Sequence, residues 1–161
     1  MTETSAMSSL RIDGLVGKPQ TINWQDLADF PATVRVADIS QLGAKRRGEA
    51  VRLAAILELV AVSPDATYIG LHATRDDFHA SIPLASVRDR ALVVYALDGQ
   101  PLTLSAGGPF RFFIPDHQAC HTHEIDECAN VKYVDWIELT RERGHDNRPQ
   151  DDASHAALHQ K

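Results

Sequence analysis

The chain has 161 residues, a length that suits one domain able to bury its own hydrophobic core. Hydrophobic residues make up 43% and charged residues 24%, which is typical of a folded globular protein and excludes a disordered chain. The formal net charge of −6 argues against a broad nucleic-acid-binding face.

The sequence shows no membrane or export segment. Residues 1–8 lack a basic start followed by an apolar run, so they do not resemble a secretory signal. The longest apolar stretch, Leu53–Val62, is short and is interrupted by Glu58. We therefore expect a cytoplasmic protein with no membrane and no nucleic-acid partner. The two cysteines, Cys120 and Cys128, are too few for a disulfide scaffold.

Composition divides the chain into a central domain and two tails. Residues 1–8 are polar and are expected to form a flexible N-terminal tail. Residues 143–161 carry almost no large apolar side chains, so burial cannot offset their ordering entropy, and we predict a disordered C-terminal tail. The folded domain should span residues 9–142.

In the first half of the domain, strand and helix patterns are mixed. Leu10–Val16 alternates and predicts a strand with a bulge at Gly14. Asn23 is expected to cap a short helix, Trp24–Phe30, that stops before Pro31. Thr33–Ile39 predicts a half-buried strand, and Ala50–Val60 predicts a helix with one apolar face.

The second half continues without a regular strand–helix alternation. We expect a short strand at Thr67–Leu71 and a short helix beginning near Pro83 and covering Leu84–Arg90. Further strands are predicted in three places: Ala91–Leu97, Phe110–Ile114 and Val131–Leu139. About six strands and three helices in no βαβ order predict an α+β fold in a single domain.

Seven segments, in chain order, resemble motifs of the oxidoreductase molybdopterin-binding domain, the sulfite oxidase-like family. They span about 130 residues and are Leu10–Pro19, Trp24–Phe30, Arg52–Leu59, Asp76–Leu84, Asp98–Leu102, Gly107–Pro115 and Asn130–Ile137. The most specific are the G-G-P-F-R-F-F-I-P and N-V-K-Y-V segments. The resemblance implies the fold of that family, with mixed sheets and short helices, and molybdopterin as the cofactor.

In that family, backbone amides and basic side chains near the last two motifs hold the pterin phosphate. By resemblance, Arg111 and Lys132 take these roles, since a guanidinium and loop amides suit a dense phosphate. Arg46 belongs to a basic cluster that could add to an anion site. The full set of cofactor-binding candidates is Arg111, Lys132, Gly107, Gly108, Asn130, Phe78, Ser81 and Arg46.

The sequence departs from the family at the metal. The family places a molybdenum-ligating cysteine just after the strand matched here by Thr33–Ile39. This chain has Asp38-Ile39-Ser40 in that stretch, and no cysteine before Cys120. A hard oxygen ligand does not replace a soft thiolate without consequence. Sulfite oxidase-type chemistry is therefore not implied, and whether the chain is an enzyme stays open.

A Cys/His-rich stretch separates the two best motifs. Thiolates and imidazoles are ligands that zinc, iron and copper prefer, although the spacing matches no known zinc pattern. The candidate metal ligands are His117, Cys120, His121, His123 and Cys128.

Three hypotheses remain open at this stage. The chain is a degenerate or non-classical module that binds the cofactor or another small anion. Alternatively it is an active molybdenum-dependent oxidoreductase with an unusual metal ligand, or a transition-metal-binding or redox-sensing protein that uses residues 117–128. The simpler alternatives are an ion-paired core-edge Arg111, a solvated Lys132 and two structural thiols. The redox partner and the oligomeric state are not predicted.

Overall fold

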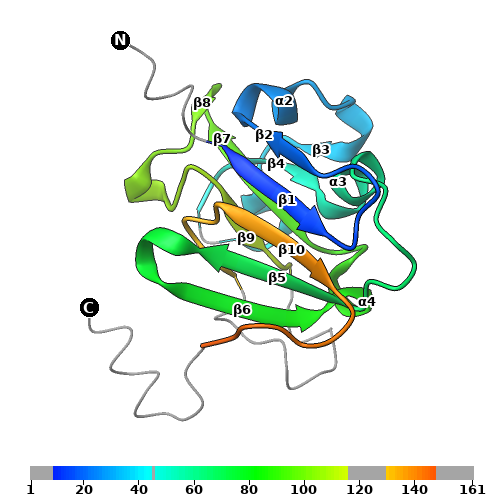
Figure 1. The fold of residues 1–161 in the computed structure, drawn as a ribbon. Helices are drawn as coiled ribbons and strands as arrows, with labels where there is room; N and C mark the ends of the chain where they lie inside the picture. Colours follow the sequence, from blue (N-terminus) through cyan, green and yellow to red (C-terminus); the bar gives the residue numbers. More distant parts are fainter. Residues whose placement is uncertain (1–8, 45, 116–129, 148–161) are drawn as a thin grey trace.

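The computed structural model describes residues 9–44, 46–115 and 130–147, which form two β-sheets packed face to face (Figure 1). The first sheet has the order β2-β1-β10-β5-β6, made by Gln20–Ile22, Leu10–Gly14, Trp136–Thr140, Tyr68–Ala73 and Phe78–Pro83. The second has the order β3-β4-β7-β8, made by Arg35–Val36, Glu49–Arg52, Leu92–Leu97 and Gln100–Pro101, with β9 (Arg111–Phe113) also paired to β7. Strands β1 and β10 run parallel, and the other described pairs are antiparallel.

Helices are few and short. The described α-helices are α2 (Trp24–Ala28), α3 (Leu53–Leu59) and α4 (Leu84–Val87). Four 3₁₀ turns also occur in the described part: η1 (Ala32–Val34), η2 (Ile39–Leu42), η3 (Thr74–Asp76) and η4 (Leu104–Ala106). The predicted α+β class with mixed sheets is confirmed. No helix in the described ranges is long and apolar enough to cross a membrane.

The two sheets share one hydrophobic core. Ile12, Leu71 and Ile137 from the first sheet join Val93 and Tyr95 from β7 in a single cluster of buried residues. The opposite face of β7 carries Leu92 and Val94, which belong to a second, smaller cluster. Strand β7 is therefore buried on both faces, which explains its uninterrupted apolar run.

Several elements form where the local sequence predicts them. Asn23 caps α2 in a reciprocal capping box, in which its side chain accepts from the Asp26 amide and the Asp26 carboxylate accepts from the Asn23 amide. Gly14 ends β1 with φ of 94°. A side chain at Gly14 would collide with the Leu139 carbonyl, so glycine permits the close approach of β1 to β10.

Two predicted elements in the first half of the chain are wrong in part. Within the expected strand Thr33–Ile39, only Arg35–Val36 pair as β3, while Thr33 and Val34 belong to η1 and Ile39 begins η2. The Asp38 side chain accepts from the Ser40 amide and starts η2, so local capping outcompetes strand pairing. The expected helix Ala50–Val60 begins as β4 and becomes α3 only at Leu53, because Ala50–Arg52 pair with β7.

In the second half, the expected short helix forms, but strands differ from expectation. Helix α4 begins at Leu84, directly after Pro83, as expected, but it ends at Val87 rather than at Arg90. Strand β6 is not among the expected strands, and its last residue is Pro83, which is tolerated at the end of an edge strand. The expected strand Val131–Leu139 is regular only from Trp136. Tyr133 has φ of 62°, and this bend directs Val131–Val134 along β9 and the Gly107 loop instead of into the first sheet.

The start of the predicted C-terminal tail is ordered. Residues 144–147 lie beside the edge strand β6, at the lower side of the molecule in Figure 1. The Asn147 amide donates to the His79 carbonyl, and the Ser81 amide donates to the Asp146 carboxylate. Side chains and backbone of this segment thus satisfy the free edge of β6. The predicted N-terminal tail and residues 148–161 lie outside the described residues.

Candidate anion-binding site

Segments far apart in the sequence meet at a small pocket of about 110 Å³. Its lining comes from the loop before β4, from η4 and the residue after it, from β9, and from the bent segment before β10. The lining residues are Arg46, Ser105, Ala106, Gly107, Arg111, Lys132 and Tyr133. Four of these, Arg46, Gly107, Arg111 and Lys132, are among the residues proposed from the sequence.

Gly107 shapes the floor of the pocket. The Thr103 side chain accepts from the Ala106 amide and so caps η4, and Gly107 ends this turn with φ of 95°. A Cβ at Gly107 would lie 2.5 Å from Cδ of Arg111 and 2.9 Å from its Nε. Only glycine therefore lets the Arg111 side chain lie against this turn.

Arg111 presents an unsatisfied donor. Its Nε is buried and has no hydrogen-bond partner, while Nη1 donates to the Ala106 carbonyl at 3.4 Å. Burial lowers the pKa of Arg111, and the nearby positive charge of Arg46 lowers it further. A guanidinium stays protonated under such shifts, so Arg111 keeps its positive charge. The described part of the chain compensates this charge poorly.

Further positive charge surrounds Arg111. Arg46 donates from Nη1 to the Ser105 carbonyl at 3.2 Å, which places its guanidinium at the pocket rim. Lys132 Nζ lies 5.6 Å from the centre of the Tyr133 ring, and the Arg75 guanidinium lies 5.2 Å from it. Within the described part of the chain, three cations and no carboxylate line the pocket.

The structure does not bring the remaining predicted cofactor-binding residues into this lining. Gly108 packs against the Leu102 backbone, and Asn130 accepts the Ile114 amide at 2.6 Å, so both support the loop from outside the pocket. Phe78 and Ser81 lie on β6 in the first sheet. Phe78 and Ser81 therefore do not line this pocket.

The metal-ligand candidates divide into two groups. Cys120, Cys128, His117, His121 and His123 lie outside the described residues. Among the residues that are described, no group of three or more His, Cys, Asp or Glu side chains could hold a metal ion.

The stretch that replaces the family's cysteine is engaged in local structure. The Asp38 carboxylate accepts from the Ser40 hydroxyl at 2.8 Å and from the Ser40 amide at 3.0 Å. Both hydrogen bonds lower the pKa of Asp38, and the bond from the Ser40 hydroxyl has the larger effect. Both oxygen-bearing side chains therefore stabilise the start of η2.

Sequence reasoning missed Tyr133, Ser105 and Ala106. Tyr133 stands next to Lys132 in the N-V-K-Y-V motif, so its position carried a signal. Ser105 and Ala106 have no motif of their own, and their role depends on the η4 turn that Thr103 caps.

Comparison with known proteins agrees with this architecture. Residues 3–147 match the family described as the oxidoreductase molybdopterin binding domain. An uncharacterized oxidoreductase, YuiH, of Bacillus subtilis is 30% identical over 139 residues, which cover 83% of this chain and 66% of that protein.

A solved structure shares the fold. The sulfane dehydrogenase SoxCD from Paracoccus pantotrophus superposes with a TM-score of 0.62 at 20% identity, over 84% of this chain and 39% of that one. The chain thus spans about two thirds of one relative and well under half of the other. The family resemblance predicted from seven sequence segments is confirmed, and the chain belongs to the oxidoreductase molybdopterin-binding domain family.

Proposed function

We propose that this chain is an anion-binding module that holds a phosphate group between Arg46, Arg111 and Lys132. The phosphate of a molybdopterin cofactor is the first candidate ligand, and a free phosphate monoester is the second. The buried, unpartnered Nε of Arg111 carries the proposal. Leaving such a donor unsatisfied costs about 1–3 kcal/mol, which an incoming phosphate oxygen would recover.

The pocket chemistry supports an anion. Two guanidinium groups and one ammonium group line it, and the Gly107 turn lets the Arg111 side chain lie along the pocket wall. Its volume of about 110 Å³ suits a phosphate group and is too small for a whole pterin. The rest of a larger ligand would therefore lie outside this pocket.

The described residues fit the phosphate end of a molybdopterin cofactor but not its metal end. Asp38 and Ser40 are hydrogen-bonded to each other, and no soft ligand stands in the described part of this stretch. When bound, the cofactor's metal would supply the redox chemistry. The described residues of this chain act in binding and orientation.

The two relatives are named as an oxidoreductase and a sulfane dehydrogenase, and both names describe redox enzymes. Because the chain covers only part of each relative, we propose cofactor or anion binding for it. Whether it also catalyses a redox reaction is an outcome of the test.

The test is phosphate binding by the full-length protein, measured by calorimetry on the wild type and on Arg111→Ala, Lys132→Ala and the double variant. Each single change should weaken binding about tenfold, as expected for one charge-assisted hydrogen bond. Arg90→Ala is the matched control, since Arg90 is exposed and lies outside the pocket lining. Unchanged binding in the double variant would refute the anion site.

Metal and pterin analysis of the freshly purified protein separates the alternatives. Pterin released from the wild type and lost in the double variant supports cofactor binding. Stoichiometric molybdenum with pterin would instead support an active oxidoreductase. Zinc or iron without pterin, lost on Cys120→Ala, would move the function to residues 117–128 and overturn the proposal.

A further inference from the structure

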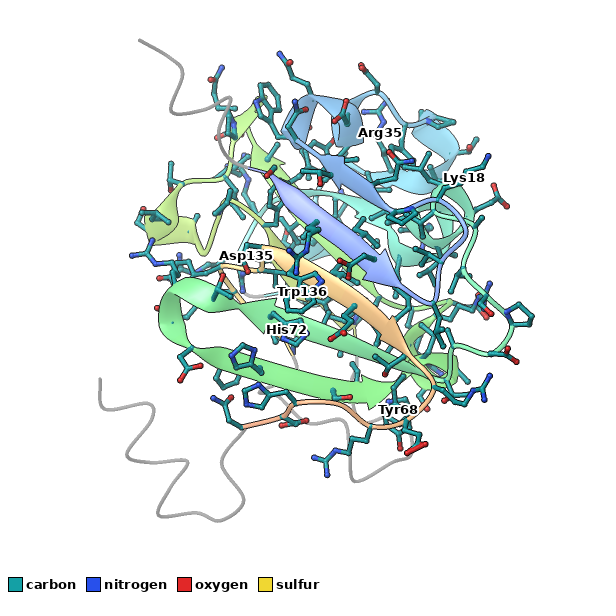
Figure 2. All side chains as sticks on the ribbon, viewed as in Figure 1. Lys18, Arg35, Tyr68, His72, Asp135 and Trp136 are labelled. Atoms are coloured by element: carbon teal, nitrogen blue, oxygen red, sulfur yellow. The ribbon has the colours of Figure 1, made fainter. Side chains whose placement is uncertain are left out.

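A row of stacked side chains crosses the outer face of the first sheet. Register places Arg11, Trp136, His72 and His79 opposite one another on β1, β10, β5 and β6. The Arg11 guanidinium lies 4.1 Å from the Trp136 ring centre, and the ring centres of Trp136 and His72 are 4.3 Å apart. Figure 2 shows Trp136 and His72 on neighbouring strands. The row continues past the sheet edge, because His79 stacks on His145 at 4.1 Å.

The two central histidines contact each other inside the protein. His72 is 3% exposed and His79 is 8% exposed, and their Nδ1 atoms are 2.8 Å apart. Gly70 lies beside His72, and a Cβ there would lie 3.0 Å from His72 Nε2. This opening lets His72 Nε2 reach the Glu138 carboxylate at 3.1 Å, while His79 Nε2 reaches Asp77 at 3.0 Å.

The hydrogen-bond partners determine the number of protons. Glu138 and Asp77, as carboxylates, only accept, so each histidine must donate through its Nε2–H. Both Nδ1 atoms would then be bare lone pairs facing each other. A separation of 2.8 Å matches the length of an N–H···N hydrogen bond, in which one proton lies between the two atoms. This assignment of protons, which follows from the hydrogen-bond partners and is tested below, gives the His72–His79 pair one proton more than two neutral rings.

The C-terminal segment is fastened directly over this pair. The His79 amide donates to the Asn147 side chain at 2.8 Å, and the Asn147 amide donates back to the His79 carbonyl at 2.9 Å. The Gly144 amide donates to Ser81 Oγ at 2.9 Å. The His145 ring also stacks on His79. The position of the segment 144–147 therefore depends on the position of the His79 ring and backbone.

We propose that the His72–His79 pair is a proton-operated latch, which holds residues 144–147 against β6 with one shared proton and releases them when a second proton binds. This device is independent of the anion pocket, which lies on other elements.

The second proton is destabilising for a geometric reason. With both rings charged, two Nδ1–H groups would point at each other across 2.8 Å, as like charges in a buried site. His72 lies between Trp136 and His79 in the row, whereas His79 lies on the edge strand β6, so we expect His79 to be the ring that turns away. Turning His79 breaks its stacking on His145 and loosens the segment.

Other charged groups around the pair set its response. Glu138 on β10 attracts a proton onto His72, and His145 on the segment opposes it. Asp77, directly before β6, lies within hydrogen-bonding distance of His79 Nε2. Arg143, directly before the segment, forms an ion pair with the buried carboxylate of Asp146 at 3.4 Å. In support, burial lowers the pKa of His72 more than its hydrogen bond and attraction to Glu138 raise it.

Release would expose a sheet edge. The amides of His79 and Ser81 now donate to Asn147 and Asp146, and they would lose these acceptors. An unprotected edge strand is a template for adding another strand. Mild acid would therefore uncover a pairing edge on this protein.

The test follows hydrogen exchange of the Gly144 and Asn147 amides in the full-length wild type, as protection factors corrected for the intrinsic pH dependence. Protection should fall about tenfold or more between about pH 7.5 and about pH 5. Side-chain ¹⁵N shifts of His72 and His79 should show both Nε2 atoms protonated and a single shared Nδ1 proton at the higher pH. Equal protection at both pH values, or two bare Nδ1 atoms, would overturn the latch.

Two variants separate the latch from simple instability. In His72→Gln the amide can still donate to Glu138 and accept from His79, but it cannot ionise, so the acid-induced loss of protection should disappear. Ser81→Ala removes the bond from the Gly144 amide and should lower protection at every pH without moving the midpoint. An unchanged midpoint in His72→Gln would assign the release to another group, such as Asp146. Stoichiometric zinc bound at the pair would also contradict the proposal.

Discussion

Gly107 and Arg111 depend on each other at the scale of single residues. The glycine turn leaves room for the arginine stem, and the arginine brings a buried donor to the pocket. The same dependence explains why the G-G-P-x-R spacing carries information: the first glycine and the arginine meet in space. Burial of a guanidinium is costly, so a site of this kind is expected to have a ligand.

The first prediction concerns Gly107→Ala. The new methyl would lie 2.5 Å from Arg111 Cδ, so the side chain must move, and phosphate binding should weaken about tenfold. Gly43→Ala is the matched control, because Gly43 has a similar φ of 94° but open space around its Cβ. Calorimetry on both variants should show a binding loss only for Gly107→Ala. Equal losses would mean that backbone strain, not the collision with Arg111, weakens binding.

A second prediction at this scale is the pH dependence of folding. Burial lowers the pKa of His72 below its usual value of 6.5. In the latch, this is the cost of the second proton on the His72–His79 pair, so the unfolded chain binds that proton at a higher pH than the folded one. The free energy of unfolding should therefore decrease as pH falls below about 6.5, until the folded-state pKa of His72 is passed. Urea unfolding across this range should show a smaller slope in His72→Gln. An identical slope in the variant would exclude His72 as the source.

At the scale of elements, local capping decides several boundaries. The capping box of Asn23 and Asp26 starts α2, and the Asp38 side chain starts η2 within a stretch whose alternation favours a strand. Pairing with β7 likewise converts the first residues of an amphipathic run into β4. Short elements in this fold therefore take their limits from side-chain hydrogen bonds and strand partners rather than from propensity.

The third prediction tests such a cap. Asn23→Ala removes the acceptor of the Asp26 amide and should lower the free energy of unfolding by about 1 kcal/mol. Gln25→Ala, at an exposed position of the same helix, should change it by less than about 0.5 kcal/mol. Urea unfolding of both variants measures the difference. Equal effects would show that helix propensity, not capping, stabilises α2.

At the scale of the whole molecule, the two sheets are joined by one buried cluster. Residues of both sheets and of α2 and α3 contribute to it, among them Ile12, Leu27, Ile56 and Val93. Neither sheet can bury its inner face without the other. The chain should therefore unfold as one cooperative unit.

The fourth prediction uses the two tryptophans of the chain as reporters. Trp24 lies on α2 and Trp136 on β10, and Trp24 packs against the shared core. In Trp24→Phe and Trp136→Phe, the remaining tryptophan should report a single fluorescence transition in urea, coincident with the loss of the far-ultraviolet circular dichroism signal of the same variant. If the fluorescence and circular dichroism transitions of either variant do not coincide, the two sheets do not unfold as one cooperative unit.

The sequence alone predicts the family, the fold class and four of the residues that line the proposed anion pocket. Arg46, Gly107, Arg111 and Lys132 belong to motifs and a basic cluster whose residue types already suit an anion. Strand β7 and the α2 cap are equally local, because an apolar run or a capping pair needs no distant partner to be recognised. What these short patterns determine is chemistry and propensity within about one turn or strand.

Tertiary structure decided the contacts between distant segments. The bend at Tyr133 brings Lys132 to the pocket, whereas Phe78 and Ser81 lie on β6 in the other sheet. Strand register alone produces the His72–His79 contact and the position of residues 144–147 beside β6. No sequence motif links β5, β6 and the C-terminal segment. Register is set by which faces the shared core buries, and that choice depends on every strand at once.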